Sequence, residues 1–144
     1  MKKAFFLFFM ITSIFCFSQN DKAEIENVVN HFFTAMRNAD GTTLKNTFSE
    51  NVVFQTIDKN GIVKTEDAHK FAESISKYSK NDLDERFKIK KILTDGNLAS
   101  VWMNYEFFFK GKVSHCGVNS FQLVKQNGIW KIQYIIDTRR KCEN

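Results

Sequence analysis

The sequence predicts an α+β domain in which a cone-shaped, curled antiparallel sheet is covered by three N-terminal helices. Three observations lead to this fold class. In the first half of the chain, apolar residues recur at helical spacing. In the second half, runs of valine, isoleucine and aromatic residues alternate with glycine-containing turn signals. The chain has 144 residues and no proline, which suits one globular domain and excludes proline-rich linkers and collagen-like repeats.

The N-terminus carries the pattern of a signal peptide. Two lysines precede an apolar run over residues 4–17, which stops at Ser18 and is shorter than the roughly 20 apolar residues that span a membrane. We therefore expect a signal peptide over residues 1–18 and a mature domain over residues 19–144. The mature protein would be secreted or periplasmic, with no membrane segment after cleavage. An uncleaved anchor and a lipid on Cys16 are the alternatives.

The charged residues and histidines argue against several classes of partner. Without the two leading lysines, the 21 basic residues become 19, against 16 acidic ones, and they are scattered along the chain. This pattern predicts a solvated surface and no nucleic-acid partner. His31 and His69 lie beside the apolar faces of predicted helices, so we expect them on the surface. The three histidines lack metal-ligand spacing, and we expect neither a metal nor a cofactor.

Two cysteines, Cys116 and Cys142, remain in the expected mature chain. In an oxidising compartment they could form a disulfide, which would close a loop of roughly 26 residues and stabilise the fold by about 3–4 kcal/mol in the chain-entropy model. Two free, partly buried thiols are the alternative, because the strand register derived below does not place the cysteines opposite each other. The sequence leaves both states open.

The first half of the mature chain predicts three helices and a first strand. Residues 21–39 form a long amphipathic helix that an aspartate and a glycine end, and a short helix over residues 42–48 follows. Residues 51–57 are β-branched and aromatic and predict a strand, on which residues 62–64 can pair back after a turn. A third helix over residues 65–78 begins with a threonine as its N-cap.

Residues 86–137 predict a four-stranded antiparallel meander with turns at 95–96, 110–112 and 127–128. Counting outward from two of these turns pairs Leu123 with Ile132, Phe121 with Tyr134, Asn119 with Ile136, Phe109 with Val113, Phe107 with His115, Tyr105 with Gly117, Met103 with Asn119, and Val101 with Phe121. One face then collects the apolar side chains and needs the helices as its cover. It comprises Ala99, Val101, Met103, Tyr105, Phe107, Phe121, Leu123, Trp130, Ile132, Tyr134 and Ile136.

The first strand of the meander needs an irregularity to keep its apolar residues on that face. Phe87 and Ile89 share one parity and Ile92 has the other, so we expect a β-bulge at Lys90 and Lys91. Bulges increase the twist of a sheet, and a curled sheet with helices in its mouth encloses a cavity. The sequence therefore predicts a pocket between the sheet and the helices.

Three segments carry a resemblance to a known family: residues 25–36 (IENVVNHFFTAM), residues 48–54 (FSENVVF), and residues 114–123 (SHCGVNSFQL) with Trp130-Lys131-Ile132. With the order of elements over residues 21–139, they make the chain resemble the nuclear-transport-factor-2-like superfamily, and within it the SnoaL-like and lumazine-binding branch. The resemblance implies the cone-shaped fold. Since this superfamily includes isomerases, dehydratases, cyclases, hydrolases and proteins without known catalysis, it implies no single reaction.

The catalytic groups of that superfamily have no clear counterparts in the predicted inner face. In ketosteroid-isomerase-like members a carboxylate base follows the first strand, and the matching position here is Thr56, beside Gln55. Such members also use an acid to bind the oxyanion, but the predicted register turns Glu106 and Asp137 to the opposite face. The histidine–carboxylate set of scytalone-dehydratase-like members and the Asp-Arg-Asp set of epoxide-hydrolase-like members are not found either. We therefore expect no catalytic carboxylates.

We expect instead an exported domain that binds a small apolar or aromatic molecule. Gly117 leaves space near the sheet, where Tyr105, His115 and Asn119 can converge on a ligand. The predicted pocket residues are Phe54, Thr56, Met103, Tyr105, His115, Asn119, Tyr134 and Ile136. One alternative is a lyase or isomerase of the SnoaL type that uses His115 and Tyr105. Another is that these polar groups only satisfy neighbouring backbone groups.

The opposite face of the predicted sheet carries a large aromatic side chain. Trp102 lies there with Asn104 and Glu106, and exposing its ring to water would be costly. Members of the superfamily often pair through this face, so the resemblance implies a homodimer. A protein-interaction module that acts through the same face is the alternative.

Overall fold

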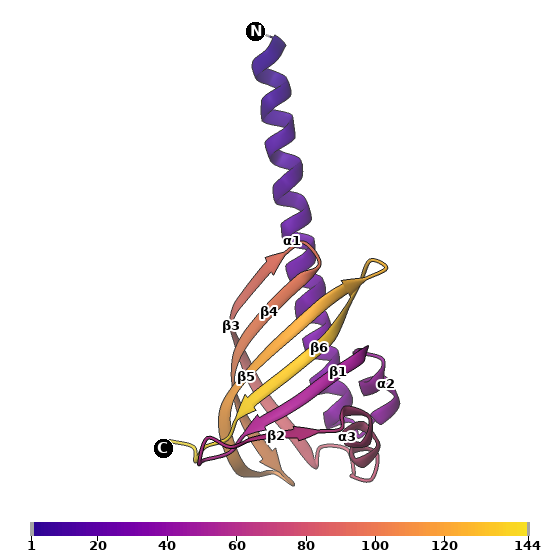
Figure 1. Ribbon diagram of the computed structural model, residues 1–144, viewed down its shortest axis with the longest axis vertical. Helices are drawn as coiled ribbons and strands as arrows, with labels where there is room; N and C mark the ends of the chain where they lie inside the picture. Colours follow the sequence, from indigo (N-terminus) through magenta and orange to yellow (C-terminus); the bar gives the residue numbers. More distant parts are fainter. Residues whose placement is uncertain (1, 144) are drawn as a thin grey trace.

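The computed structural model describes residues 2–143, with side chains from residue 20 onward, and it packs helices against one face of a six-stranded sheet (Figure 1). The helices are α1 (Lys2–Arg37), α2 (Gly41–Lys45) and α3 (Ala68–Ile75). The strands are β1 (Phe48–Ile57), β2 (Val63–Glu66), β3 (Leu83–Asp95), β4 (Leu98–Phe109), β5 (Lys112–Gln126) and β6 (Ile129–Thr138). The expected α+β class is confirmed.

Helix α1 is longer than the amphipathic pattern predicts, because it continues to the N-terminus. Its first half projects beyond the sheet (Figure 1). The segment predicted to be a signal peptide is the start of this helix, and its side chains lie outside the described part of the structure. Within the described residues, no helix has the length and apolar character needed to cross a membrane. Cleavage after Ser18 stays a prediction.

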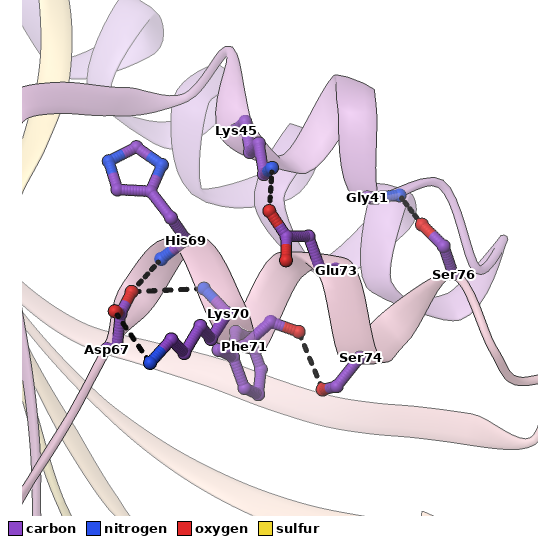
Figure 2. Close-up of polar contacts among 9 residues, drawn as sticks. All are labelled: Gly41, Lys45, Asp67, His69, Lys70, Phe71, Glu73, Ser74 and Ser76. Atoms are coloured by element: carbon purple, nitrogen blue, oxygen red, sulfur yellow. Dashed lines mark hydrogen bonds and ion pairs between the residues drawn. The ribbon is translucent and has the colours of Figure 1, made fainter.

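Helices α2 and α3 pack against each other beside the C-terminal end of α1. The Nζ atom of Lys45 lies 3.0 Å from Oε1 of Glu73, and the N–H of Gly41 donates to Oγ of Ser76 at 3.2 Å (Figure 2). The second helix is shorter than predicted, because Phe48 already belongs to β1.

The cap of helix α3 differs from the predicted one. Asp67 caps it: Oδ1 of this carboxylate accepts hydrogen bonds from the backbone N–H groups of His69 and Lys70, each at 3.0 Å (Figure 2). Thr65, the expected N-cap, lies in β2 opposite Gln55. The charged carboxylate of Asp67 accepts stronger hydrogen bonds than the hydroxyl of Thr65 would, and with Asp67 as the cap, Thr65 can pair in the sheet.

The sheet is mixed, with the strand order β2-β1-β6-β5-β4-β3. The four strands of the predicted meander are all antiparallel neighbours, but β1 pairs parallel with β6. The prediction of a purely antiparallel sheet is therefore wrong. Helix α3 carries the chain from β2 to β3 at the other edge, and the meander then brings β6 back to β1 in the same direction (Figure 1). The sheet has no strong curl, in contrast to the curled, cone-shaped sheet that was expected.

Most of the predicted register of the meander is confirmed. Leu123 pairs with Ile132, Tyr105 with Gly117, Phe107 with His115, Met103 with Asn119, and Val101 with Phe121. The expected bulge in β3 is present, because the register shifts between Ile89 and Lys91. The pairing of Phe109 with Val113 is wrong. Phe109 faces Lys112 instead, because the turn between β4 and β5 has two residues and a register shift follows it.

A second bulge, which the sequence pattern did not predict, lies in β6 at Gln133. Leu123 pairs with Ile132, but the next pair is Gln122 with Tyr134, so Gln133 is an extra residue. Its side chain is held by β1: Nε2 donates to the carbonyl of Asn51 at 2.8 Å, and Oε1 accepts from Oγ of Ser49 at 2.9 Å. The predicted pairs of Phe121 with Tyr134 and of Asn119 with Ile136 are therefore wrong.

The bulge at Gln133 exchanges the two faces for the rest of β6. Phe121 now lies opposite Ile135, and Asn119 lies opposite Asp137. Because side chains alternate along a strand, Ile135 and Asp137 share the inner face and Tyr134 and Ile136 leave it. The bulge thus decides which residues of β6 reach the helices.

The hydrophobic core lies between α1 and the inner face of the sheet. Along α1 the buried residues are Ile25, Val29, Phe32, Phe33 and Met36, and their partners in the sheet include Val101, Met103, Phe121, Leu123, Trp130 and Ile132. Phe32 is central, because its ring packs against Phe33, Phe48, Phe54 and Phe121 with centroids 5.0–6.2 Å apart. Such aromatic contacts stabilise the core beyond simple area burial.

Candidate ligand pocket

A pocket of about 300 Å³ opens where the core ends. One wall is apolar and aromatic, with Phe32 and Phe33 from α1, Phe54 from β1 and Phe71 from α3 among its residues. The inner faces of β3 to β6 contribute the polar groups Glu85, Tyr105, His115, Asn119 and Asp137, which lie among apolar residues such as Phe107, Phe121 and Ile135. A cavity with an apolar wall and a few convergent polar groups is the usual form of a small-molecule site.

Of the eight residues that the sequence placed in the pocket, five line it: Phe54, Thr56, Tyr105, His115 and Asn119. Met103 is fully buried in the core instead. Tyr134 and Ile136 are on the outer face, because the bulge at Gln133 precedes them. The Tyr134 hydroxyl donates to Oε1 of Gln55 on the neighbouring strand at 2.6 Å.

The pocket contains acidic groups that sequence reasoning missed. Glu85, Asp137 and Glu66 line it, together with Arg139. The expectation that the inner face has no carboxylate is therefore wrong. Asp137 is turned inward by the bulge in β6, whereas Glu106 lies on the outer face as predicted.

Glu85 could have been found from the sequence. It precedes Phe87 and Ile89 at the same parity, and both of those residues were expected to point inward. The predicted meander begins at residue 86, three residues after the true start of β3 at Leu83, and therefore leaves Glu85 out. Extending the alternation by two residues places the Glu85 carboxyl on the inner face.

Glu85 is the most perturbed carboxyl group of the site. Burial raises its pKa from the ordinary value of 4.5 to about 8, and the nearby charge of Asp137 acts in the same direction. The side-chain amide of Asn119 donates to Oε1 of Glu85 at 2.6 Å, which opposes the rise, as does the charge of Arg139. Glu85 thus carries a proton at neutral pH in the unliganded pocket.

Asp137 is the centre of a second group of polar contacts in the pocket lining. The Tyr105 hydroxyl lies 3.1 Å from Oδ2 of Asp137 and 2.9 Å from the carbonyl oxygen of Thr138. Oδ2 of Asp137 also accepts from Nε of Arg139 at 3.0 Å. Burial, together with the negative charges of Asp137 and Glu85, raises the pKa of Tyr105, so this phenol stays neutral and acts as a donor.

Gly117 does not leave space for a ligand, contrary to the prediction. A Cβ at this position would overlap the carbonyl oxygen of Thr138 and would lie 2.8 Å from Cε1 of Tyr105. The missing side chain therefore lets the Tyr105 ring and the backbone of β6 approach the strand closely. Glycine is needed here to position the tyrosine rather than to widen the pocket.

His115 is half-buried beside aromatic rings. Its ring centroid is 5.7 Å from that of Tyr105 and 5.1 Å from that of Phe107. Nδ1 lies 3.0 Å from the hydroxyl oxygen of Ser114. Burial and the positive charge of Arg139 lower the pKa of His115, against the effect of Asp137. The imidazole is therefore neutral at pH 7, where it can both donate and accept a hydrogen bond.

A disulfide joins Cys116 to Cys142 beside the pocket, with their Cα atoms 5.0 Å apart. Cys142 lies beyond β6, in a tail that folds back on β5. In this tail, the N–H of Arg140 donates to the carbonyl oxygen of Cys116 at 2.8 Å, and the N–H of Cys116 donates to the carbonyl oxygen of Arg140 at 2.9 Å. The predicted register could not place the two cysteines opposite each other, because it did not include this tail.

The other predicted positions lie away from the pocket. Trp102, Asn104 and Glu106 are exposed on the outer face, and 52% of the Trp102 surface is accessible to solvent. His31 and His69 are exposed on their helices. Among the described residues, no group of three or more potential ligands could hold a metal ion.

The fold and its pocket define the class of the domain, which is nuclear-transport-factor-2-like. A structure of a nuclear-transport-factor-2-like protein of unknown function from Shewanella baltica has a TM-score of 0.71 at 17% identity, and the match covers 85% of this chain and 96% of the other. A cystatin-like domain of unknown function from Nostoc punctiforme gives 0.68 at 15% identity, over 85% and 79% of the two chains. A ketosteroid isomerase-like protein from Erwinia carotovora gives 0.60 at 18% identity, over 83% and 96%.

The chain belongs to the family described as "Putative lumazine-binding", whose model matches residues 20–134. A comparison with curated proteins found no match. At these identities the similar structures establish the fold only, so the activity has to be argued from the pocket itself.

Proposed function

We propose that this domain binds a small, largely aromatic or apolar molecule in the pocket between α1 and the sheet. The observation that carries the proposal is the mixed lining, which combines aromatic rings with the hydrogen-bonding groups of Tyr105, Asn119 and Glu85. A flat ring system would pack against the aromatic rings, and its polar edge would meet the hydrogen-bonding groups. The family description names a compound of this kind, the bicyclic lumazine.

Thermal unfolding with added ligand tests the proposal. Lumazine and a panel of one-ring and two-ring aromatic compounds are added to the purified domain. A ligand at 100 times its Kd stabilises the folded state by about 2.7 kcal/mol, which raises the melting temperature. The variant Ser74→Tyr narrows the pocket and should lose the shift, whereas Ser79→Tyr, at an exposed position outside the pocket, should keep it.

Native mass spectrometry of protein purified from its own host gives an independent test. A retained small molecule would appear as a mass increment that Ser74→Tyr removes. The proposal is contradicted if no compound shifts the melting temperature and no increment is found.

A second candidate function is proton transfer, in a lyase or isomerase, with His115 and Tyr105 at the site. The observation that favours it is the Glu85 carboxyl, whose pKa of about 8 suits a general acid or base near neutral pH. The Tyr105 hydroxyl would donate a hydrogen bond to a developing oxyanion. Exchange of the α-protons of 2-tetralone in D₂O, followed by NMR, tests this candidate. Catalysed exchange that Glu85→Gln and Tyr105→Phe slow would support it, and exchange at the rate of buffer alone would reject it.

We also propose that the domain is exported, with cleavage after Ser18. The N-terminal charge and apolar pattern supports this, and the Cys116–Cys142 disulfide suits an oxidising compartment. The intact mass of the protein from culture medium and periplasm should correspond to residues 19–144 with one disulfide. A chain that retains residues 1–18 would contradict the proposal.

The exposed outer face supports a further proposal of a homodimer. Trp102 is half exposed, and it is flanked by the polar residues Asn104 and Glu106. Sedimentation of the wild type and of Trp102→Glu should show a dimer that the substitution dissociates, because a charge would replace the apolar ring at the interface. A wild type that stays monomeric at high micromolar concentration would contradict the homodimer.

A further inference from the structure

The charge of the pocket is unbalanced. Glu66, Glu85 and Asp137 contribute three carboxyl groups, whereas Arg139 contributes the one guanidinium in the lining that the structure describes. His115 adds no positive charge at neutral pH, because burial lowers its pKa. When the carboxyl groups are ionised, the pocket is therefore negative.

The guanidinium of Arg139 already forms an ion pair with the Asp137 carboxylate. Its Nε atom lies 3.0 Å from Oδ2 of Asp137, and the same oxygen is within reach of the Tyr105 hydroxyl. Glu85 has only a neutral hydrogen-bond partner among the described residues, the amide of Asn119. A buried carboxyl group without a cation beside it remains protonated, because ionisation in a medium of low polarity is costly.

The aromatic part of the pocket lining is suited to a cation. Phe32, Phe33, Phe54 and Phe71 line it, and the face of each phenyl ring carries negative electrostatic potential. The hydroxyl of Thr56 also lines the pocket, and its buried oxygen has no hydrogen-bond partner among the described groups. Aromatic faces and a carboxyl group without a counter-ion favour a positively charged group over an anion, and the Thr56 hydroxyl offers a further hydrogen-bonding group to the ligand.

We propose that the ligand of this pocket is an organic cation, an ammonium or a protonated nitrogen heterocycle on an aromatic or apolar body, and that Glu85 is its counter-ion. This inference rests on the proposed binding function and specifies the class of ligand. The apolar body lies against the phenylalanine rings, and the positive group lies toward the Glu85 carboxylate. Binding releases the proton of Glu85 to solvent, so that one carboxyl group becomes ionised for each cation bound.

The release of this proton predicts a pH dependence. The polar and titratable groups that line the pocket with Glu85 include Glu66 from β2, Tyr105 from β4, His115 and Asn119 from β5, Asp137 from β6 and Arg139 just after β6, while α1 contributes the uncharged Phe33 and Met36. The pKa of His115 is below its usual 6.5 and that of Tyr105 is above its usual 10, so neither titrates between pH 7 and 9. Glu85 does, since its pKa is about 8. The affinity for a permanent cation should therefore rise about tenfold between pH 7 and pH 9.

The experiment compares two probes of nearly the same shape, phenyltrimethylammonium and its neutral isostere tert-butylbenzene. Binding is followed by NMR titration at pH 7, 8 and 9. Calorimetry in two buffers of different ionisation enthalpy counts the protons released. The wild type should prefer the cation, bind it about tenfold more tightly at pH 9 than at pH 7, and release about 0.9 proton at pH 7.

Two variants with the same substitution, a glutamine in place of a glutamate, complete the test. Glu85→Gln keeps the shape of the side chain and should remove both the preference for the cation and its pH dependence. Glu50→Gln changes an exposed carboxylate outside the pocket lining and should leave both unchanged.

Two results would overturn the inference. If both probes bind equally well at every pH, the charge of the ligand is irrelevant, although the proposed binding function stands. If the cation does not bind at millimolar concentration, the inference is also wrong, and the thermal screen decides the binding function separately.

Discussion

The two halves of the inner sheet face differ in what they bury. The core half, built from Val101, Met103, Leu123, Trp130 and Ile132, is entirely apolar and closely covered by α1. The pocket half, built from Glu85, Tyr105, His115, Asn119 and Asp137, carries a polar or titratable group at each of these positions. Strands β4, β5 and β6 contribute to both halves, and β3 adds Glu85 to the pocket half. The inner face of the sheet thus concentrates stabilising contacts at one end and leaves chemically active groups at the other.

The bulge at Gln133 marks the border between the two halves. Before it, Trp130 and Ile132 follow the alternation that continues from the turn. After it, Asp137 occupies the inner face, where an unbroken strand would have placed Ile136. One extra residue therefore converts an apolar lining into an acidic one.

Substitution in the core half should have the largest effect on stability. Trp130 is 2% exposed, and its Nε1 lies 3.4 Å from Oδ1 of Asp21 on α1. Trp130→Ala should lower the free energy of unfolding by about 3–5 kcal/mol, because it leaves a large cavity. Urea denaturation followed by circular dichroism measures this loss. Between pH 6 and pH 7 the pH dependence of stability should stay that of the wild type, because the pKa of Asp21, the titratable partner of Trp130, is lowered from its ordinary acidic value. A loss below about 1 kcal/mol would contradict the assignment of Trp130 to the core.

Removal of the disulfide should have the next largest effect. For a sequence separation of 26 residues, the double variant Cys116→Ala, Cys142→Ala should lose about 3.5 kcal/mol in the chain-entropy model. The tail pairs with β5 beside Tyr105, so the amide of Arg140 should also exchange with deuterium faster. The exchange of the Ile132 amide should accelerate only as much as the global loss of stability requires. Urea denaturation and hydrogen exchange check both effects. If the exchange of the Arg140 and Ile132 amides accelerates equally, the tail without the disulfide opens only together with the core, and the expected local effect is absent.

Neutralising Glu85 should have a smaller effect, confined to the pocket half and visible as a pH dependence. Its folded-state pKa of about 8 lies above the ordinary 4.5. Below pH 4.5 both states are protonated, and between about 4.5 and 8 only the unfolded state ionises. The contribution of Glu85 to stability is therefore full at low pH and is lost as the pH rises toward 8.

The variant Glu85→Gln has no titratable group at this position, so the difference between its stability and that of the wild type gives the pH-dependent contribution of Glu85. From pH 6 to pH 7, the wild type should lose up to about 1.4 kcal/mol of unfolding free energy relative to the variant. Urea denaturation of both proteins at the two pH values measures the difference, with Glu50→Gln as the control. Parallel pH profiles for the wild type and Glu85→Gln would mean that Glu85 is ionised in the folded protein.

Much of the fold was predictable, because it follows from local patterns. The amphipathic spacing of Ile25 to Met36 predicted the part of α1 that covers the sheet, and the Asn127-Gly128 turn predicted the pairing of Leu123 with Ile132. The bulge near Lys90 was also predictable, since apolar residues change parity within one strand. Such signals involve neighbouring residues, so they can be read without knowing which distant segments meet.

The polar half of the site was less predictable, because its geometry depends on distant partners. Tyr105, His115 and Asn119 were placed correctly from the hairpin register. Asp137 was placed on the wrong face, because the bulge before it depends on contacts of Gln133 with Ser49 and Asn51 of β1. The parallel pairing of β1 with β6 leaves no mark on the alternation of either strand alone.

By itself, the sequence determined the α+β class, the apolar face of α1 and the antiparallel meander, because hydrophobic periodicity and turn residues act locally. Only the tertiary structure decided that Asp137 and Arg139 join Glu85 in the pocket, and that the Cys142 tail lies against Cys116. The physical reason is that burial and charge depend on what distant segments bring together. Glu85 acquires its raised pKa from the surroundings that β4, β5 and β6 provide, and its own segment contains no sign of them.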